Sequence, residues 1–183
     1  LDAASKGQIE VGKITLKTES QRGVAGLMLG RGDATLSKLT AGIKEPAPFK
    51  AGLTGLRYAY QSSAEGDFLN SDVQLGLATL DLNGKHYGPA QMAFAARHLH
   101  APTVARLEQL FLDMDKQGLA AAGATDKAFE LVKKNGLPLL RHDPQLELKQ
   151  LDIHLPEGDV KVSGKLALKG FQDKDLEQPL VLL

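Results

Sequence analysis

Apolar residues from Leu69 to Leu82 alternate with polar ones, but the alternation slips by one position inside the run. They fall first on odd and then on even positions: Leu69, Val73, Leu75 and Leu77, followed by Leu80 and Leu82. Successive side chains of a strand point to opposite faces, so the slip would turn the apolar face outward unless an extra residue is accommodated. The pattern predicts one long strand with a β-bulge around Ala78 and Thr79.

Other stretches repeat the same spacing of apolar residues. Two full copies and one shortened copy occur, at Ile9, Val11, Ile14 and Leu16, at Leu146, Leu148, Leu151 and Ile153, and at Leu53, Leu56, Tyr58 and Tyr60. Two of the strands lead into a Glu-Gly-Asp turn, at Glu65–Asp67 and at Glu157–Asp159. With the first run there are three full copies and a partial one, which indicates a repeated β-hairpin unit.

Glycine, proline and asparagine divide the remaining strand-like segments. Asn83-Gly84 suits a type I′ turn, so the chain is expected to reverse there and return along Ala90–Leu99. Gly30–Gly32 is expected to break the apolar run of residues 24–39 into two short strands. Ala41–Lys50 contains two prolines and no periodicity, which predicts a surface loop and the best candidate for an internal boundary.

The period changes from strand to helix at Ala101. Apolar residues then follow at helical spacing, at Val104, Leu107, Leu110, Phe111 and Met114, with Pro102 suited to the first turn. This predicts an amphipathic helix that ends before Gly118, and a second helix from Thr125 to about Asn135. Leu137–Leu140 fits a short helical turn or an extended link equally well.

Together these elements predict an α+β fold in a single domain, residues 1–183. We expect a strongly curved antiparallel sheet of repeated bulged hairpins, with two or three helices packed on its concave side. Two arrangements satisfy the pattern. The helices either close the core or leave an apolar groove, for which the candidate lining residues are Val104, Leu107, Leu110, Phe111 and Met114.

Composition narrows the possible functions. The chain is 43% hydrophobic, and its 22 basic and 22 acidic residues cancel without forming a long block of like charge, which argues against a nucleic-acid partner. It has no cysteine and no run of about eighteen apolar residues that would span a bilayer. It starts without methionine and finishes on an apolar string, so we expect a piece of a longer protein, cut at both ends.

Candidate chemical sites are few. His98 and His100 would share one face of a strand, as a metal pair does, but no third ligand is evident and a structural role is favoured. Asp113 and Asp115 point in different directions on a helix. No serine sits in a Gly-x-Ser-x-Gly motif, and Gly30–Gly32 lacks the third glycine of a dinucleotide fingerprint. The sequence thus predicts no catalytic residue, no metal, no cofactor and no enzyme activity.

Several segments resemble one family of bacterial proteins. Leu56–Tyr60, Ser71–Leu77, the helical residues 105–111 and the closing hairpin, residues 151–168, resemble the YdgA-like family of unknown function. The resemblance covers most of the chain from about residue 50. It implies an envelope protein held to the inner membrane by an N-terminal helix, with its bulk in the periplasm, and a distant relationship to AsmA-like proteins. The family offers no established site residues.

Two functional hypotheses follow. In the first, the chain is a non-enzymatic periplasmic binding or carrier module whose apolar concave groove accepts a lipid or another extended apolar ligand. In the second, it is a structural or protein-interaction domain of the envelope with a closed core and no ligand, which associates with an envelope protein or with itself through its sheet edges. Co-purification of a lipid separates the two.

Overall fold

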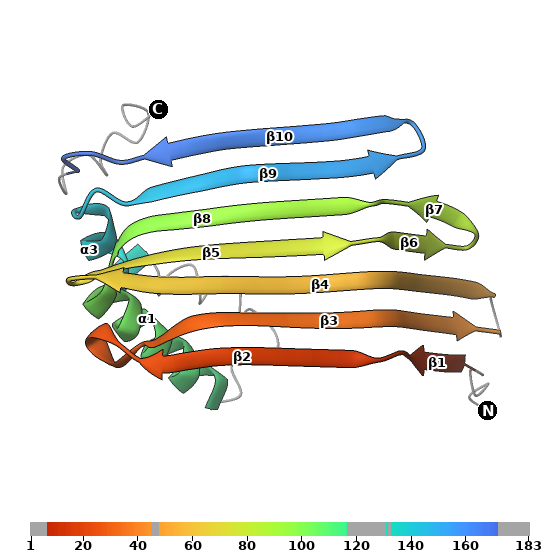
Figure 1. Ribbon diagram of the computed structural model, residues 1–183, viewed down its shortest axis with the longest axis horizontal. Coiled ribbons are helices and arrows are strands. Elements are labelled where there is room, and N and C mark those ends of the chain that lie inside the picture. Colours follow the sequence, from red (N-terminus) through yellow and green to blue (C-terminus); the bar gives the residue numbers. More distant parts are fainter. Residues whose placement is uncertain (1–6, 45–47, 117–130, 132, 172–183) are drawn as a thin grey trace.

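The computed structural model describes residues 7–44, 48–116, 131 and 133–171. They form one antiparallel sheet of ten strands, with helices gathered at one end of it (Figure 1). The strands are β1 (Gly7–Val11), β2 (Ile14–Arg22), β3 (Met28–Ile43), β4 (Phe49–Glu65), β5 (Phe68–Leu77), β6 (Thr79–Leu82), β7 (Lys85–Tyr87), β8 (Ala90–His100), β9 (Gln145–Leu155) and β10 (Gly158–Ala167). The helical elements are the 3₁₀ turn η1 (Val24–Gly26), α1 (Ala101–Lys116) and α3 (Leu137–Leu140).

The strands are arranged as a meander. The order across the sheet is β1-β3-β4-β5-β8-β9-β10, with β2 beside β3 and the β6–β7 hairpin continuing the line of β5 and β8. This confirms the predicted antiparallel sheet with few helices, and the sheet is open. Strong curvature and the packing of helices on a concave side stay predictions.

The hairpins form largely where turn residues predict them. Asn83 and Gly84 have φ values of 51° and 82°, and Leu82 pairs with Lys85, as a type I′ turn requires. β3 and β4 pair as far as Ile43 opposite Phe49, so the sheet continues past most of the predicted 41–50 loop. Residues 45–47 lie outside the described part of the chain.

The predicted bulge at Ala78–Thr79 is wrong. A bulge sets two residues against one and shifts the pairing register, but β4 pairs with β5 and β6 in a single register on both sides of this point. Instead, each neighbouring strand carries two residues between its flanking apolar positions, all in one row: Gly12–Lys13, Ser37–Lys38, Thr54–Gly55, Ala78–Thr79 and Gly88–Pro89. The slip therefore runs across the sheet as one coordinated feature.

A true bulge occurs in the last copy of the repeated pattern. In β9, Lys149 and Gln150 together occupy the space of one residue, so the register shifts against both β8 and β10. β9 alone carries the extra residue at this point, and β8 has a separate bulge at Arg97 and His98, which together lie opposite Asn70 of β5. The same spacing in the sequence thus has two structural outcomes, depending on whether the adjacent strands share it.

The predicted break at Gly30–Gly32 is also wrong, because β3 runs straight through it. Gly30 has φ of 149°, and a Cβ there would lie 2.0 Å from the backbone oxygen of Glu19 on β2. A Cβ on Gly32 would meet the ring of Tyr60 at 2.3 Å. These glycines permit close approach inside the sheet instead of ending a strand.

The buried core lies at the helical end. Leu27, Leu69 and Ala101 form a cluster with exposed fractions of 6%, 9% and 0%, and the first turn of α1 packs against it. The Ala101 amide donates a 2.8 Å hydrogen bond to the carbonyl of Asp67, which fixes the start of α1 on the sheet. The α1 prediction is confirmed, and Leu137–Leu140 is a helical turn. The second predicted helix, from Thr125, lies mostly outside the described residues.

Candidate apolar binding face

Cross-strand pairing lines up the apolar positions of all the long strands on one face of the sheet. One row of partners runs across the whole sheet through Leu16, Ala34, Tyr58, Leu75, Met92, Leu151 and Val162. Further along the strands, beyond the coordinated slip, a second row of partners is also apolar: Val11, Leu39, Leu53, Leu80 and Tyr87. We call the face that carries the first row the apolar face. Its existence follows from the alternation in each strand together with the register between strands.

Much of the apolar face remains exposed. Leu16 is 71% exposed, Tyr58 41% and Val162 47%, although these residues lie in three different strands. At ~3.3 Å per residue and ~4.8 Å between strands, seven strands up to seventeen residues long give a whole sheet face of roughly 1,500 Å². The largest apolar patch on an ordinary monomer is about 300–600 Å². The geometric area of this sheet face is thus larger than an ordinary apolar patch, and α1 covers one end of it.

The predicted groove residues of α1 occupy different environments. Leu107 is buried and Val104 packs against the Leu27–Leu69–Ala101 cluster, so both contribute to the core. Leu110 and Met114 are half-buried, and Phe111 is 39% exposed. α1 thus caps one end of the apolar face with one side and presents apolar surface on another. A ligand contact by any of the five stays a prediction.

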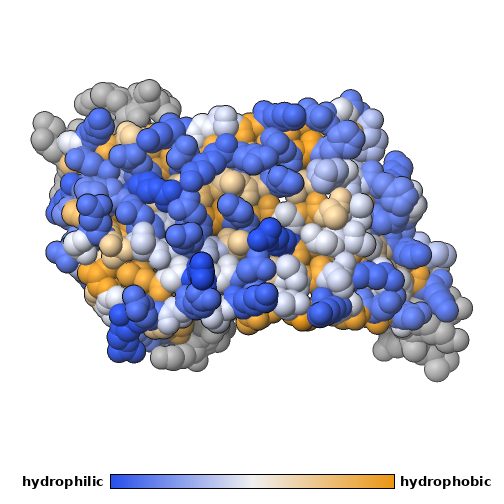
Figure 2. Space-filling view, in the orientation of Figure 1, coloured by the Kyte–Doolittle hydropathy of each residue, from blue (hydrophilic) through white to orange (hydrophobic). Residues whose placement is uncertain are grey.

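The opposite face, which we call the polar face, carries a network of ion pairs. Arg31 lies 2.7 Å from Glu19 and Arg57 lies 2.8 Å from Asp33. The side chains surround a hollow of about 650 Å³, and hydrophilic residues dominate this side of the sheet (Figure 2). Exposed ion pairs typically contribute ~0–1 kcal/mol each. The polar face is therefore the solvated side, and its charges neutralise one another.

Asp72 is the centre of the network. Its Oδ1 accepts hydrogen bonds of 2.7 Å from Arg97 on β8 and of 2.7 Å from Lys149 in the β9 bulge. The hydrogen bond from Arg97 is the main cause that lowers the pKa of the Asp72 carboxyl, and Lys149 adds to it. The sequence pattern placed charges opposite the apolar positions, but only the strand order brings these three side chains together.

Three histidines meet at the helical end of the sheet. The rings of His100 and His142 stack with centroids 4.2 Å apart, and His98 stacks on Phe68 at 3.8 Å. His98 Nδ1 donates to the backbone carbonyl of His142 across 2.6 Å, and His100 Nδ1 lies 2.8 Å from Thr103 Oγ1. The cluster fastens the α3–β9 connection to the β8–α1 junction. No group of ligands suited to a metal ion occurs among the described residues.

Acid is expected to weaken the fold through this cluster. Burial lowers the pKa of His100 and the nearby His142 lowers it further, while Asp67 opposes them. The folded state then binds fewer protons than the unfolded chain, so stability falls as the pH drops below the ordinary histidine pKa of ~6.5, until the folded pKa is passed. Urea unfolding between about pH 7.5 and pH 5.5 measures this loss.

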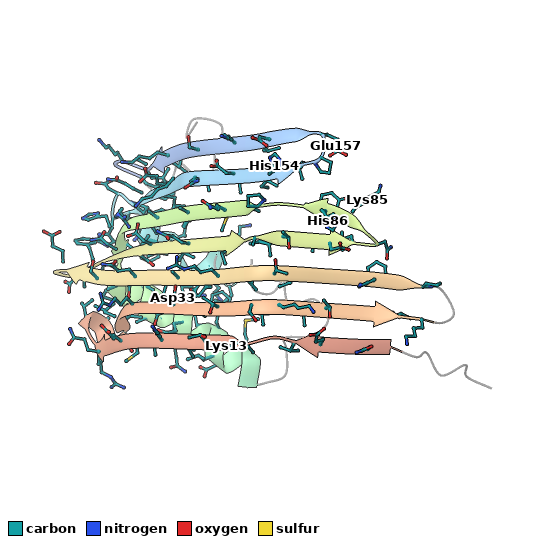
Figure 3. The ribbon with its side chains drawn as sticks, turned by 45° about the vertical axis from the view of Figure 1, so that its right-hand side comes forward. Lys13, Asp33, Lys85, His86, His154 and Glu157 are labelled. Carbon is teal, nitrogen blue, oxygen red and sulfur yellow. The ribbon has the colours of Figure 1, made fainter. Side chains whose placement is uncertain are left out.

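The control for this prediction is a histidine remote from the cluster. His100→Gln should flatten the stability profile over that pH range, because it removes the group with the lowered pKa. His86→Gln, at the end of the sheet away from the helices (Figure 3), should leave the acid-induced loss in place. Equal profiles for His100→Gln and the unmodified protein would contradict the assignment.

The remaining polar candidates have ordinary structural partners. His86 pairs with Asp81 at 2.9 Å, and His154 contacts Asp159 across the closing hairpin. Asp113 accepts a hydrogen bond of 2.9 Å from Gln109 one turn earlier on α1. Among the described helices, none combines the length and apolar character needed to cross a membrane.

Comparison with known proteins identifies a family for the chain. The sequence model of a family described as bacterial protein of unknown function (DUF945) matches residues 1–183. This agrees with the expected membership of an uncharacterised bacterial family. No curated protein and no solved structure matches the chain.

Proposed function

Since this chain belongs to the DUF945 family of bacterial proteins of unknown function, we propose that it is a non-enzymatic module that binds an extended apolar ligand on its apolar face. The single observation that supports this is the size and exposure of that face, with Leu16, Leu75 and Val162 all at least 39% exposed. The polar face is solvated and lies on the opposite side of the sheet. A single antiparallel layer can therefore have one solvated face and one apolar face.

The ligand class follows from the chemistry of the face. Its side chains are aliphatic or aromatic, and the described polar groups on it are few, such as the Tyr60 hydroxyl, which lies 3.1 Å from Thr18 Oγ1. Binding to such a surface is stabilised by ~0.8 kcal/mol for each methylene group that is buried. The surface has few groups that could recognise a polar ligand. Acyl chains of a lipid fit this description. The outer side of α1, at Phe111, would border the bound chains at the helical end.

The second candidate is a protein-interaction domain whose apolar face is covered by another protein. The width of the face favours this alternative, since seven strands at ~4.8 Å span roughly 30 Å, more than one acyl chain covers. The same surface then serves as a standard-size interface of ~800 Å² or more per partner. The two candidates differ in what co-purifies with the chain.

Binding is tested with a matched pair of variants on β5. Leu75 and Gln74 are adjacent, neutral and exposed, but they lie on opposite faces of the sheet. Leu75→Glu places a charge in the apolar face and should weaken binding of a fluorescent fatty acid by at least about tenfold, or ~1.4 kcal/mol. Gln74→Glu should leave binding unchanged. Fluorescence titration, with native mass spectrometry of the purified protein, provides the measurement.

Two outcomes reject the lipid proposal. The first is a protein that carries no lipid and does not bind the fatty acid probe. The second is equal loss of binding in both variants, which would locate the probe elsewhere. A protein partner retained by the unmodified chain and lost from Leu75→Glu would instead establish the interaction-domain alternative.

The location of this activity is part of the proposal. The resemblance to YdgA-like and AsmA-like proteins supports a place in the bacterial envelope, with the parent protein anchored in the inner membrane and this region in the periplasm. Fractionation of cells that express the full-length parent tests it. Recovery of the protein in the cytoplasmic fraction would refute this placement.

A further inference from the structure

The last strand leaves one whole edge of the sheet open. β10 pairs with β9 on one side, and among the described strands none pairs with its other side (Figure 1). All ten of its residues are exposed. An open strand edge carries unpaired N–H and C=O groups that readily pair with a strand of another chain.

β10 carries only part of the usual protection of such an edge, namely charged side chains on its polar face. It contains no proline, and its positions on the apolar face hold no charge: Val160, Val162, Gly164 and Leu166. Its charged residues, Asp159, Lys161 and Lys165, all fall on the polar face. The opposite edge of the sheet differs, because the slip at Gly12–Lys13 divides it into β1 and β2. β10 is thus the longer uninterrupted edge strand.

We propose that two copies of this chain join through β10, antiparallel, about a two-fold axis at Val162. A second copy is the partner that the charges of β10 itself select. With Val162 opposite its own counterpart, Asp159 lies opposite Lys165 twice, and Lys161 lies opposite Ser163. Opposite charges that face each other across an antiparallel pair stabilise it, and like charges destabilise it.

The two neighbouring registers of the β10–β10 pair place like charges opposite each other. Antiparallel partners share a face, so the register can move only in steps that keep the apolar positions together. A shift of the centre toward the carboxyl end sets Lys161 against Lys165 twice. A shift the other way sets Lys161 against its own copy. The charge pattern therefore favours one register.

The axis is perpendicular to the sheet, so the apolar faces of the two copies end up on the same side. The dimer then has one apolar face of twice the width. This assembly does not depend on the ligand of the proposed function, because pairing uses the edge of the sheet and leaves its face free.

Cysteine cross-linking tests the register, since the natural chain has no cysteine. Val162→Cys places two thiols on directly opposite residues, with Cα atoms ~4.5–5.5 Å apart, within the ~7 Å limit for a disulfide. Val160→Cys, on the same face of the same strand, separates its Cα atoms by four residue steps, or ~13 Å. Oxidation should give a covalent dimer of Val162→Cys and little of Val160→Cys.

Charge reversal tests the partner choice by sedimentation equilibrium. Lys165→Asp sets two aspartates against each other and should raise the dimer dissociation constant at least about tenfold. Lys161→Asp makes the same charge change opposite a serine and should not weaken the dimer. Asp159→Lys combined with Lys165→Asp should restore it, with circular dichroism as the check on folding.

Three results would overturn the proposal. A protein that stays monomeric up to ~100 μM has no such interface, because standard interfaces reach affinities tighter than this. Equal cross-linking of the two cysteine variants refutes the register. Weakening by Lys161→Asp as strong as that by Lys165→Asp refutes the charge pairing.

Discussion

Leu69→Ala is expected to lower the free energy of unfolding by about 2–4 kcal/mol, the usual cost of removing a buried leucine side chain. Leu69 is 9% exposed and packs between Leu27 and Ala101, where η1, β5 and α1 meet. The truncation leaves a cavity that these three elements cannot fill without separating from one another. Urea denaturation followed by circular dichroism measures the change.

Leu75→Ala is the matched control, because Leu75 lies on the same face of the same strand. It is 39% exposed, so its truncation should cost less than ~1 kcal/mol. A similar loss for both variants would contradict the conclusion that the core is confined to the helical end. It would show that the apolar face is covered in solution.

Gly30→Ala is expected to destabilise the sheet by about 2 kcal/mol or more. The new Cβ would lie 2.0 Å from the backbone oxygen of Glu19, and φ of 149° is a conformation that alanine rarely adopts. The obstacle is backbone, so no rotation of a side chain relieves it. The β2–β3 pair must separate locally, and thermal unfolding should report a lower midpoint.

Gly164→Ala provides the comparison within the same sheet. A Cβ at Gly164 meets nothing within 4 Å, and its φ lies outside the positive range. Alanine there should be neutral or stabilise by up to ~1 kcal/mol, because it restricts the unfolded chain. Equal effects at the two glycines would show that the close approach at Gly30 relaxes at little cost.

A single-layer sheet is an unusual way to use so much apolar sequence. Antiparallel sheets commonly bury one face against a second layer. In the described part of the chain, α1 provides that layer at one end of the sheet, while side chains such as Ile14 and Leu16 are 67% and 71% exposed at the edge. The two proposals assign the exposed apolar face to an apolar ligand and the open edge to a second copy.

The sequence alone determined the elements and much of their connection. Alternation identified most of the strand segments but not their lengths, Asn83-Gly84 located a hairpin, and the change of period at Ala101 located α1. These are local signals, since they depend on residues close together in the chain and on the geometry of one strand or one helix.

The tertiary structure decided what each of these local signals does to its strand. The slip after Leu77 looks like a bulge within one strand, yet it becomes a row across the sheet because the neighbouring strands share it. Gly30 looks like a strand end, yet it is where two backbones come close. Whether an extra residue or a glycine bends, ends or continues a strand depends on its partner strand, which the local sequence does not encode.

The same reason explains what the sequence missed at the surface. His98 and His100 are close in sequence, but His142 joins them only because α3 leads into β9 beside β8. Alternation predicts an apolar face, whereas its exposure depends on the area that α1 covers. The sequence by itself determined which residues share a face of the sheet. Only the tertiary structure decided which parts of that face are buried, because burial requires a second layer and α1 is too short to cover the strands.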